Sequence, residues 1–268
     1  MNTSLSSNNP TVASLFASAN ANGTITNAAA AVVVPNMTAN IQAALGVSVD
    51  DVQASNVVLV TIVLDDSSSI GFSNNEATLI DGANLIIDAI GASKEDGLLV
   101  CIRRLNAGTL CPFTPLAQAP RVSAANYRAN GYTPLYDNVA ETMGLVLAKT
   151  QDFTSNGVPV RSVTIVVTDG ADYGSRAHTR PESVRPIIDD AHKAEQHIVC
   201  AMGIDDGSTN FRDIFGRMGI PDRWILTPKN NPREIRAAFV MASKSAARAS
   251  VAAPGAFSAT AGGGFGAP

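Results

Sequence analysis

Basic residues are absent from the first third of the chain, because the first lysine or arginine among its 268 residues is Lys94. A secretory signal peptide begins with a basic region, so we expect none here. The formal net charge is -4, which disfavours binding to nucleic acids through their phosphates. Aromatic residues make up only 5% of the chain, too few for a base-stacking platform. No apolar run reaches the roughly 18 residues of a membrane-spanning helix, so we expect no span.

Cysteines are few, and the common catalytic motifs are missing. The three cysteines, Cys101, Cys111 and Cys200, are odd in number and form no CxxC pair. They are typical of reduced thiols in a cytoplasmic protein. The sequence contains no GxxxxGK[ST], GxSxG or HExxH motif. An aspartyl-phosphate mechanism would need an acid two residues after Asp65, where Ser67 stands. We therefore predict that the protein is not an enzyme.

The two ends of the chain differ in composition from its centre. Residues 1–49 carry no charged side chain, and we interpret residues 1–50 as a low-complexity N-terminal arm. Such an arm is either a disordered tail or a segment that packs on a neighbour through its apolar residues. Residues 250–268 form a Gly/Ala-rich tail, with Phe257 and Phe265 as its apolar anchors. The expected organisation is therefore arm, central domain over 51–249, and tail.

Between these ends, apolar β-rich runs alternate with stretches of helical periodicity. Residues 57–64 (VVLVTIVL) and 163–167 (VTIVV) are typical of parallel strands buried on both faces. Residues 134–149 have the periodicity of an amphipathic helix, and Pro186 should end or kink a helix over 181–195. This alternation predicts a doubly wound α/β sheet.

Polar side chains follow the two most apolar strands at the point where each strand should end. Asp65, Ser67 and Ser69 come after the first strand, Asp169 follows the second, and Thr133 opens the helix at 134. In open α/β sheets, ligands bind beyond the carboxyl ends of the strands, so these groups should converge. Carboxylates and hydroxyls are hard oxygen ligands, which suit Mg²⁺, Mn²⁺ or Ca²⁺. The alternative is that the serines cap a helix and Asp169 stabilises a turn.

These residues, in this order, resemble the metal-ion-dependent adhesion site of the von Willebrand factor type A family. The matching parts are Asp65-x-Ser67-x-Ser69, then Gly131-Tyr132-Thr133-Pro134-Leu135-Tyr136-Asp137, then Thr168-Asp169-Gly170. The resemblance covers about residues 55–249 and is closest to the intracellular bacterial branch. It implies a Rossmann-like, mostly parallel six-stranded sheet with helices on both faces.

The resemblance also implies a function and roles for individual residues. Asp65 would anchor a divalent cation, Ser67 and Ser69 would supply hydroxyl ligands, and Thr133 and Asp169 would bind directly or through water. A carboxylate of a protein partner would complete the coordination. Proteins of this branch resemble adaptors of MoxR-type AAA+ ATPases or of stress-response complexes. The alternative function is a structural subunit that self-assembles, as a homo-oligomer, through its uncharged ends.

The sequence also suggests positions for several residues outside the five proposed metal ligands. Tyr132, Asp172 and Arg176 are the expected partner-binding rim of the site. His178 and Arg180 either face an acidic partner or are solvated. The residues expected at the solvent surface are Asp66, Arg103 and Arg104, and Trp224 is expected in the core.

Overall fold

The computed structural model describes residues 10–92, 97–251 and 264–265, and its centre is a six-stranded sheet. The strand order is β3-β2-β1-β4-β5-β6. The strands are β1 (Val57–Leu64), β2 (Leu98–Arg104), β3 (Gly108–Pro115), β4 (Val160–Thr168), β5 (His197–Gly203) and β6 (Ile225–Leu226). Only the edge pair β2–β3 is antiparallel, and the other pairs are parallel. The prediction of a doubly wound, Rossmann-like, mostly parallel sheet is confirmed.

The two most apolar runs of the sequence form the adjacent central strands β1 and β4. They pair in parallel from Val57 opposite Val160 to Leu64 opposite Val167, and every residue of both strands is buried. Burial on both faces explains why these runs are continuously apolar instead of alternating. Because the register is unbroken, the residues that follow the two strands leave the sheet side by side.

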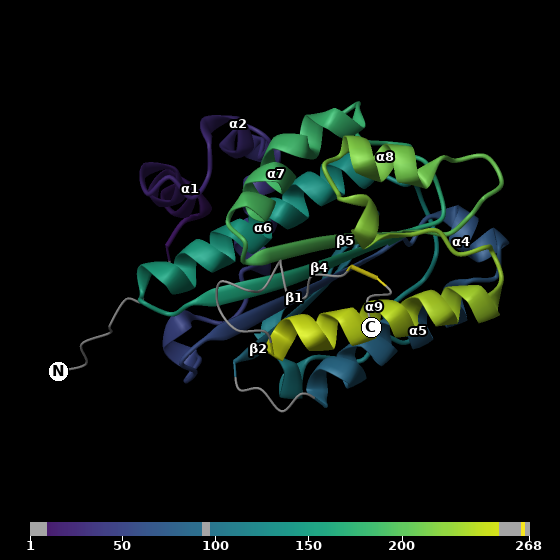
Figure 1. Ribbon diagram of the computed structural model, residues 1–268, viewed down its shortest axis with the longest axis horizontal. Helices are drawn as coiled ribbons and strands as arrows, with labels where there is room; N and C mark the ends of the chain where they lie inside the picture. Colours follow the sequence, from purple (N-terminus) through teal and green to yellow (C-terminus); the bar gives the residue numbers. More distant parts are fainter. Residues whose placement is uncertain (1–9, 93–96, 252–263, 266–268) are drawn as a thin grey trace.

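Helices cover both faces of the sheet (Figure 1). α6 (Leu135–Ser155) and α7 (Arg185–Lys193) lie on one face, and α5 (Glu76–Gly91) and α9 (Pro232–Val251) lie together on the other. Pro186 lies at the first turn of α7, directly after the 3₁₀ turn η3 (Pro181–Val184), so it separates the two segments as expected. The shorter elements are α4 (Ser68–Phe72), α8 (Phe211–Arg217), η2 (Leu116–Gln118) and η4 (Asp222–Trp224).

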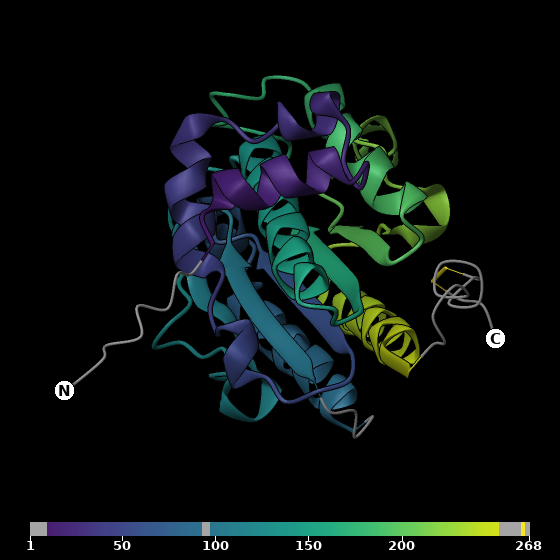
Figure 2. The same cartoon turned by 90° about the vertical axis from the view of Figure 1, so that its left-hand side faces the viewer.

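Residues 10–51 form an outer layer of short helices, which we call the N-terminal layer. It comprises α1 (Val12–Ala21), α2 (Asn27–Ala30), α3 (Pro35–Ala44) and the 3₁₀ turn η1 (Val49–Asp51). α1 and α3 pack on α6, and α2 packs on α7 (Figure 2). The disordered-tail interpretation is therefore wrong for residues 10–51, because buried apolar residues recur every three or four positions: Val12, Leu15 and Ala19 in α1, and Met37, Ile41 and Ala44 in α3. The division of the chain at residue 50 stays a prediction.

Three side chains from outside this layer form hydrogen bonds with its backbone. The His178 ring Nε2 donates to the Val32 carbonyl oxygen at 2.9 Å. Asp190 Oδ2 accepts hydrogen bonds from the Thr26 amide and hydroxyl, both at 2.7 Å. The third contact comes from a buried lysine on α6, described next. Because buried polar groups must find partners, these contacts fix where the layer sits.

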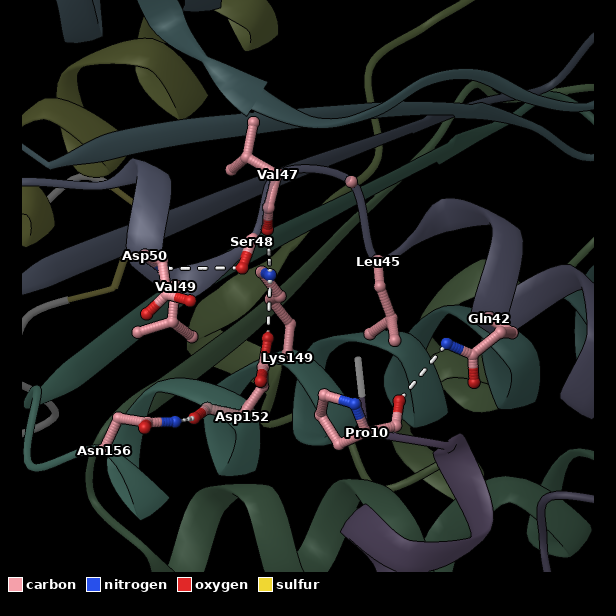
Figure 3. A pocket seen from close by; sticks show the side chains of 11 residues that line it. Pro10, Gln42, Leu45, Val47, Ser48, Val49, Asp50, Lys149, Asp152 and Asn156 are labelled. Atoms are coloured by element: carbon pink, nitrogen blue, oxygen red, sulfur yellow. Dashed lines mark hydrogen bonds and ion pairs between the residues drawn. The ribbon is translucent and has the colours of Figure 1, made fainter. Parts of the chain in front are cut away.

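Lys149 lines a pocket of about 180 Å³ between the N-terminal layer and the end of α6 (Figure 3). Its Nζ donates to the Val47 carbonyl oxygen at 2.5 Å and to Asp152 Oδ2 at 2.9 Å. The ammonium also lies 4.8 Å from the centre of the Phe153 ring. Burial lowers the pKa of Lys149, and the hydrogen bond to Asp152 partly offsets this effect.

The structure corrects one surface expectation and confirms one core expectation. Arg103 is buried and ion-paired with Glu141 of α6, so it is not a solvated edge residue, and Arg104 is half-buried. Trp224 lies in the core as expected. The Phe265 ring packs edge to face with it, and the two ring centres are 5.5 Å apart. Phe257 lies outside the described residues. The three cysteines are buried and free.

Candidate metal site

The candidate site lies where β1 and β4 end. The Asp65 amide donates to the Val167 carbonyl oxygen at 2.9 Å, which extends the pairing of the two strands by one step. Asp65 and Asp169 are the first residues beyond their strands, and because Leu64 pairs with Val167, the register places Asp65 opposite Thr168 and one residue from Asp169. Each follows a run of apolar residues buried in the sheet, and this fixes the position of both carboxyl groups.

Asp65 is fully buried and lies at the base of the site. Its Oδ1 accepts a hydrogen bond from the Ser67 amide at 2.8 Å. Its Oδ2 accepts from the Thr168 hydroxyl at 2.5 Å and from the Asp169 amide at 3.4 Å. Both oxygens of one carboxylate therefore hold the two loops of the site together.

Side-chain oxygen atoms of Ser67, Ser69 and Asp169 form a chain across the site. The Ser67 and Ser69 hydroxyl oxygens lie 2.9 Å apart, and the Ser69 hydroxyl donates to Asp169 Oδ1 at 2.5 Å. Thr133 faces the same spot, because a Cβ at Gly170 would lie 3.6 Å from Thr133 Oγ1 and 3.9 Å from Ser69 Oγ. The structure thus brings together all five residues that the sequence singled out.

The alternative role of Ser67 and Ser69 is to cap a helix. Ser67 occupies the N-cap position of α4, yet its side chain makes no capping hydrogen bond among the described residues. Its hydroxyl turns instead toward Ser69 and the site. The hydroxyl oxygens are therefore aimed at the carboxylates and not at the start of the helix.

Burial makes the negative charges of the site costly. Desolvation raises the pKa of Asp65, although hydrogen bonds from Ser67 and Thr168 offset part of this effect. Desolvation also raises the pKa of Asp169 to about 6, and the nearby charges of Asp65 and Asp206 add to that rise. The main influences on the two pKa values are burial, hydrogen bonds and, for Asp169, other acids, and none of them is a basic group. A bound cation would relieve this unfavourable charge.

The donor set fits a hard divalent cation. It consists of two carboxylates and three hydroxyls, which are all oxygen ligands of the kind that Mg²⁺, Mn²⁺ and Ca²⁺ accept. Within the described part of the chain, no cluster of three or more His, Cys, Asp or Glu could hold a metal. An ion at this site would therefore depend on the hydroxyls of Ser67, Ser69 and Thr133.

Three supporting residues were not predicted from the sequence. The Tyr127 hydroxyl donates to the Asp65 carbonyl oxygen, and Thr168 binds the Asp65 carboxylate. Asp66, expected at the surface, is instead buried, and its carboxylate accepts from the amides of Asn106 (2.6 Å) and Ala107 (3.0 Å). Thr168 could have been found from its place beside Asp169, whereas no local pattern indicates Tyr127.

The expected rim residues have different environments. Tyr132 is exposed, and its neighbour Thr133 exchanges two backbone hydrogen bonds with Tyr173. Asp172 is half-buried, and its Oδ1 accepts from the Tyr136 amide at the start of α6 and from the Ser175 hydroxyl. Arg176 is exposed. His178, also considered as a partner-facing residue, is buried against the N-terminal layer, whereas Arg180 is exposed.

No protein-family model and no curated protein matches the sequence, but solved structures match the fold. A von Willebrand factor type A protein from Catenulispora acidiphila aligns with a TM-score of 0.50 and 17% identity, over 73% of this chain and 43% of that one. The pilus adhesin SpaC from Lactobacillus rhamnosus GG aligns with a TM-score of 0.50 and 14% identity, over 74% and 31%. Proximal thread matrix protein 1 from the mussel byssus, with a zinc-occupied adhesion motif, aligns with a TM-score of 0.41 and 16% identity, over 70% of this chain and 47% of that one.

The chain spans less than half the length of each of these three structures. At such identities the likeness concerns the fold alone. The sheet order, the helices on both faces and the two structures that align at 0.50 agree on one architecture. The chain has the von Willebrand factor type A fold.

Proposed function

We propose that the protein is a metal-dependent protein-interaction module. Asp65, Ser67, Ser69, Thr133 and Asp169 hold a divalent cation, with Mg²⁺ as the first choice and Mn²⁺ or Ca²⁺ as alternatives. The observation that carries this proposal is the linked set of side chains at the ends of the two central strands: the Ser67 amide donates to Asp65, the Ser67 and Ser69 hydroxyls lie 2.9 Å apart, and the Ser69 hydroxyl donates to Asp169. A cation supplied there gives these desolvated carboxylates a counter-ion.

The partner contributes a carboxylate. Mg²⁺ binds in octahedral geometry, so five protein ligands leave one coordination position of the ion open. An acidic side chain of another protein is the ligand best suited to that position. Tyr132, Asp172 and Arg176 are proposed as the surrounding rim, with Asp172 acting through its hold on the start of α6.

The proposal extends to the partner class and the location. A MoxR-type AAA+ ATPase or a stress-response complex is the partner that the family resemblance implies, and a non-catalytic adaptor is the role. The cytoplasm is the proposed compartment, which the three free, buried thiols support. Among the described residues, no helix has both the length and the apolarity needed to cross a membrane. Self-assembly through uncharged ends has less support, because the apolar residues of the N-terminal layer pack within the chain.

Calorimetry of the metal-free protein with Mg²⁺ and Mn²⁺ tests the metal claim. Asp65→Asn should abolish the binding heat, because it removes the charge at the base of the site while keeping its shape. Ser69→Ala, a milder change, should weaken binding, and Asp51→Asn, at an exposed acid outside the site, should leave it unchanged. Equal affinities in all four proteins would remove the metal site from the proposal.

Affinity capture with the wild-type chain and with Asp65→Asn tests the partner claim. The proposed partner binds the wild-type bait in Mg²⁺, leaves it on addition of EDTA, and does not bind the variant. A partner that remains bound in EDTA and also binds Asp65→Asn would show that the interaction is independent of the metal.

A further inference from the structure

Three exposed aromatic side chains lie around the proposed metal site. Large apolar side chains exposed among the described residues are Phe72 (86%), Tyr132 (62%), Tyr173 (69%) and Met241 (37%). Met241 lies on α9, whereas the other three lie on the segments that carry the proposed metal ligands. We call Phe72, Tyr132 and Tyr173 the aromatic rim. Aromatic side chains this exposed contribute little to the core, and their grouping marks an interaction surface.

The chain connectivity keeps each of these residues close to a proposed ligand. Tyr132 directly precedes Thr133, so their Cα atoms are about 3.8 Å apart. Phe72 follows Ser69 by three residues in α4, which is about one helical turn. Tyr173 pairs with Thr133 in an antiparallel bridge, whose two hydrogen bonds measure 2.9 and 2.8 Å. The backbone of each of the three aromatic residues therefore lies within about one helical turn, or one strand pairing, of a proposed ligand.

The backbone beneath the rim is held in place. The Tyr132 and Tyr173 rings pack edge to face, with centres 5.4 Å apart and planes at 65°. Gly174 has φ +116°, and a Cβ there would lie 3.1 Å from the Tyr132 Cβ, so a glycine lets the two loops approach. Gly131, next to Tyr132, forms two hydrogen bonds with Ser68 of α4. Its amide donates to the Ser68 hydroxyl, and its carbonyl oxygen accepts from the Ser68 amide. Aromatic groups that are ordered before binding lose little entropy on contact.

We propose that the aromatic rim selects partner segments in which an acidic residue is flanked, within two positions, by an apolar or aromatic residue. The acidic side chain binds the ion, and the flanking side chain packs on Phe72, Tyr132 and Tyr173. Aromatic residues beside a buried polar contact are typical centres of binding energy. This inference rests on the proposed function, because the ion sets the position of the acidic residue.

A protein segment fits the rim better than an acidic sugar. Sugar rings stack on flat aromatic faces, whereas the Tyr132–Tyr173 pair meets at 65° and presents one ring edge beside one face. Such a corner receives a branched or aromatic side chain that packs on both rings. An extended peptide advances about 3.3–3.6 Å per residue, so a residue one or two positions from the ion-bound acid lies within about 7 Å of it along the peptide.

The first test is selection of a random peptide library on the full chain in Mg²⁺, with elution by EDTA. The expected peptides contain Asp or Glu with Leu, Ile, Phe, Tyr or Trp within two positions. Acidic peptides without such a neighbour would overturn the rim inference and leave the proposed function standing. Absence of EDTA-eluted acidic peptides would instead contradict the proposed function itself.

The second test uses one enriched peptide, labelled for fluorescence polarisation, and single variants of the rim. Phe72→Ser, Tyr132→Ser and Tyr173→Ser should each lower its affinity about tenfold, while Met241→Ser should leave it within about twofold. The Mg²⁺ affinity measured by calorimetry should be unchanged in all four variants. A loss of peptide affinity then comes from the missing aromatic side chain and not from damage to the metal site. Equal peptide affinity in the rim variants and Met241→Ser would overturn the inference. So would an oligoglucuronate that binds more tightly than the peptide and depends on the same three residues.

Discussion

The Ser69 hydroxyl donates a hydrogen bond to Asp169 Oδ1 at 2.5 Å, although 100 residues separate the two in sequence. The contact exists because β1 and β4 are neighbours in the sheet and end at the same level. One hydroxyl therefore links the two halves of the candidate site. It also shows that the Asp169 carboxylate is oriented toward the serines and not toward solvent.

Metal affinity should depend on pH through Asp169, whose pKa burial raises to about 6. Without metal, this raised pKa gives stability that is full below the ordinary value near 3.8 and is lost as pH rises through 6. The cation needs the deprotonated carboxylate, so its affinity changes in the opposite direction. We expect Mg²⁺ to bind about tenfold more weakly at pH 5 than at pH 7.5, since one pH unit below the pKa leaves roughly a tenth of the group ionised.

Calorimetry at pH 5, 6 and 7.5 measures this dependence. Asp169→Asn serves as the control, because it removes the titrating group and should flatten the part of the profile centred near pH 6. Affinity that is identical at pH 5 and pH 7.5 in the wild-type protein would contradict the expected coupling between protonation of Asp169 and metal binding.

The strands and the candidate site could be predicted because their signals are local. Residues 57–64 and 163–167 are unbroken apolar runs, and polar residues follow both at strand ends. The rule that ligands bind beyond the carboxyl ends of parallel strands then groups Asp65 with Asp169 from the sequence alone.

The wrong expectations concern charged or polar residues whose partners are distant in sequence. Arg103 pairs with Glu141, 38 residues away, and Asp66 binds the amide of Asn106, 40 residues away. His178 binds the carbonyl of Val32, 146 residues away. A polar side chain is expected at the surface, because burial is costly unless a partner pairs with it. These partners are distant in sequence, so only the fold shows that they are present. The sequence alone does not decide between a disordered tail and a packed segment for the N-terminal layer, because a segment without charge resembles low complexity.

The buried pair of Lys149 and Asp152 predicts a non-additive effect on stability. Their side chains are only 1% and 9% exposed, so removing either one leaves an unpaired buried charge. Lys149→Ala should lower the free energy of unfolding by about 3–5 kcal/mol. The double variant Lys149→Met/Asp152→Leu should be less destabilised than Lys149→Ala, because no buried charge remains. Urea unfolding measures both, and a double variant less stable than the single one would contradict the argument.

Two glycines with similar backbone angles should respond differently to alanine. Gly46 has φ +69° and Gly157 has φ +78°, so alanine is strained at both. A Cβ at Gly46 would lie 1.9 Å from the Phe113 carbonyl oxygen, whereas a Cβ at Gly157 meets nothing within 4 Å. Gly157→Ala should therefore cost about 1–2 kcal/mol of unfolding free energy from strain alone. Gly46→Ala should cost clearly more, because β3 must also move. Thermal unfolding of both variants checks this, and equal losses would mean that the close approach at Gly46 is easily relieved.

The N-terminal layer should behave as part of the core and not as a tail. Ile41 of α3 is fully buried, although the segment to which it belongs carries no charged residue. Ile41→Ala should lower the free energy of unfolding by about 2–5 kcal/mol, as in other cores. Ala43→Ser, at an exposed position of the same helix, should change it by less than about 0.5 kcal/mol. Removal of residues 1–48 should uncover the apolar face of α6 and produce aggregation or a large drop in Tm. A truncated protein that stays monodisperse with an unchanged Tm, together with a neutral Ile41→Ala, would show that the layer does not stabilise the fold.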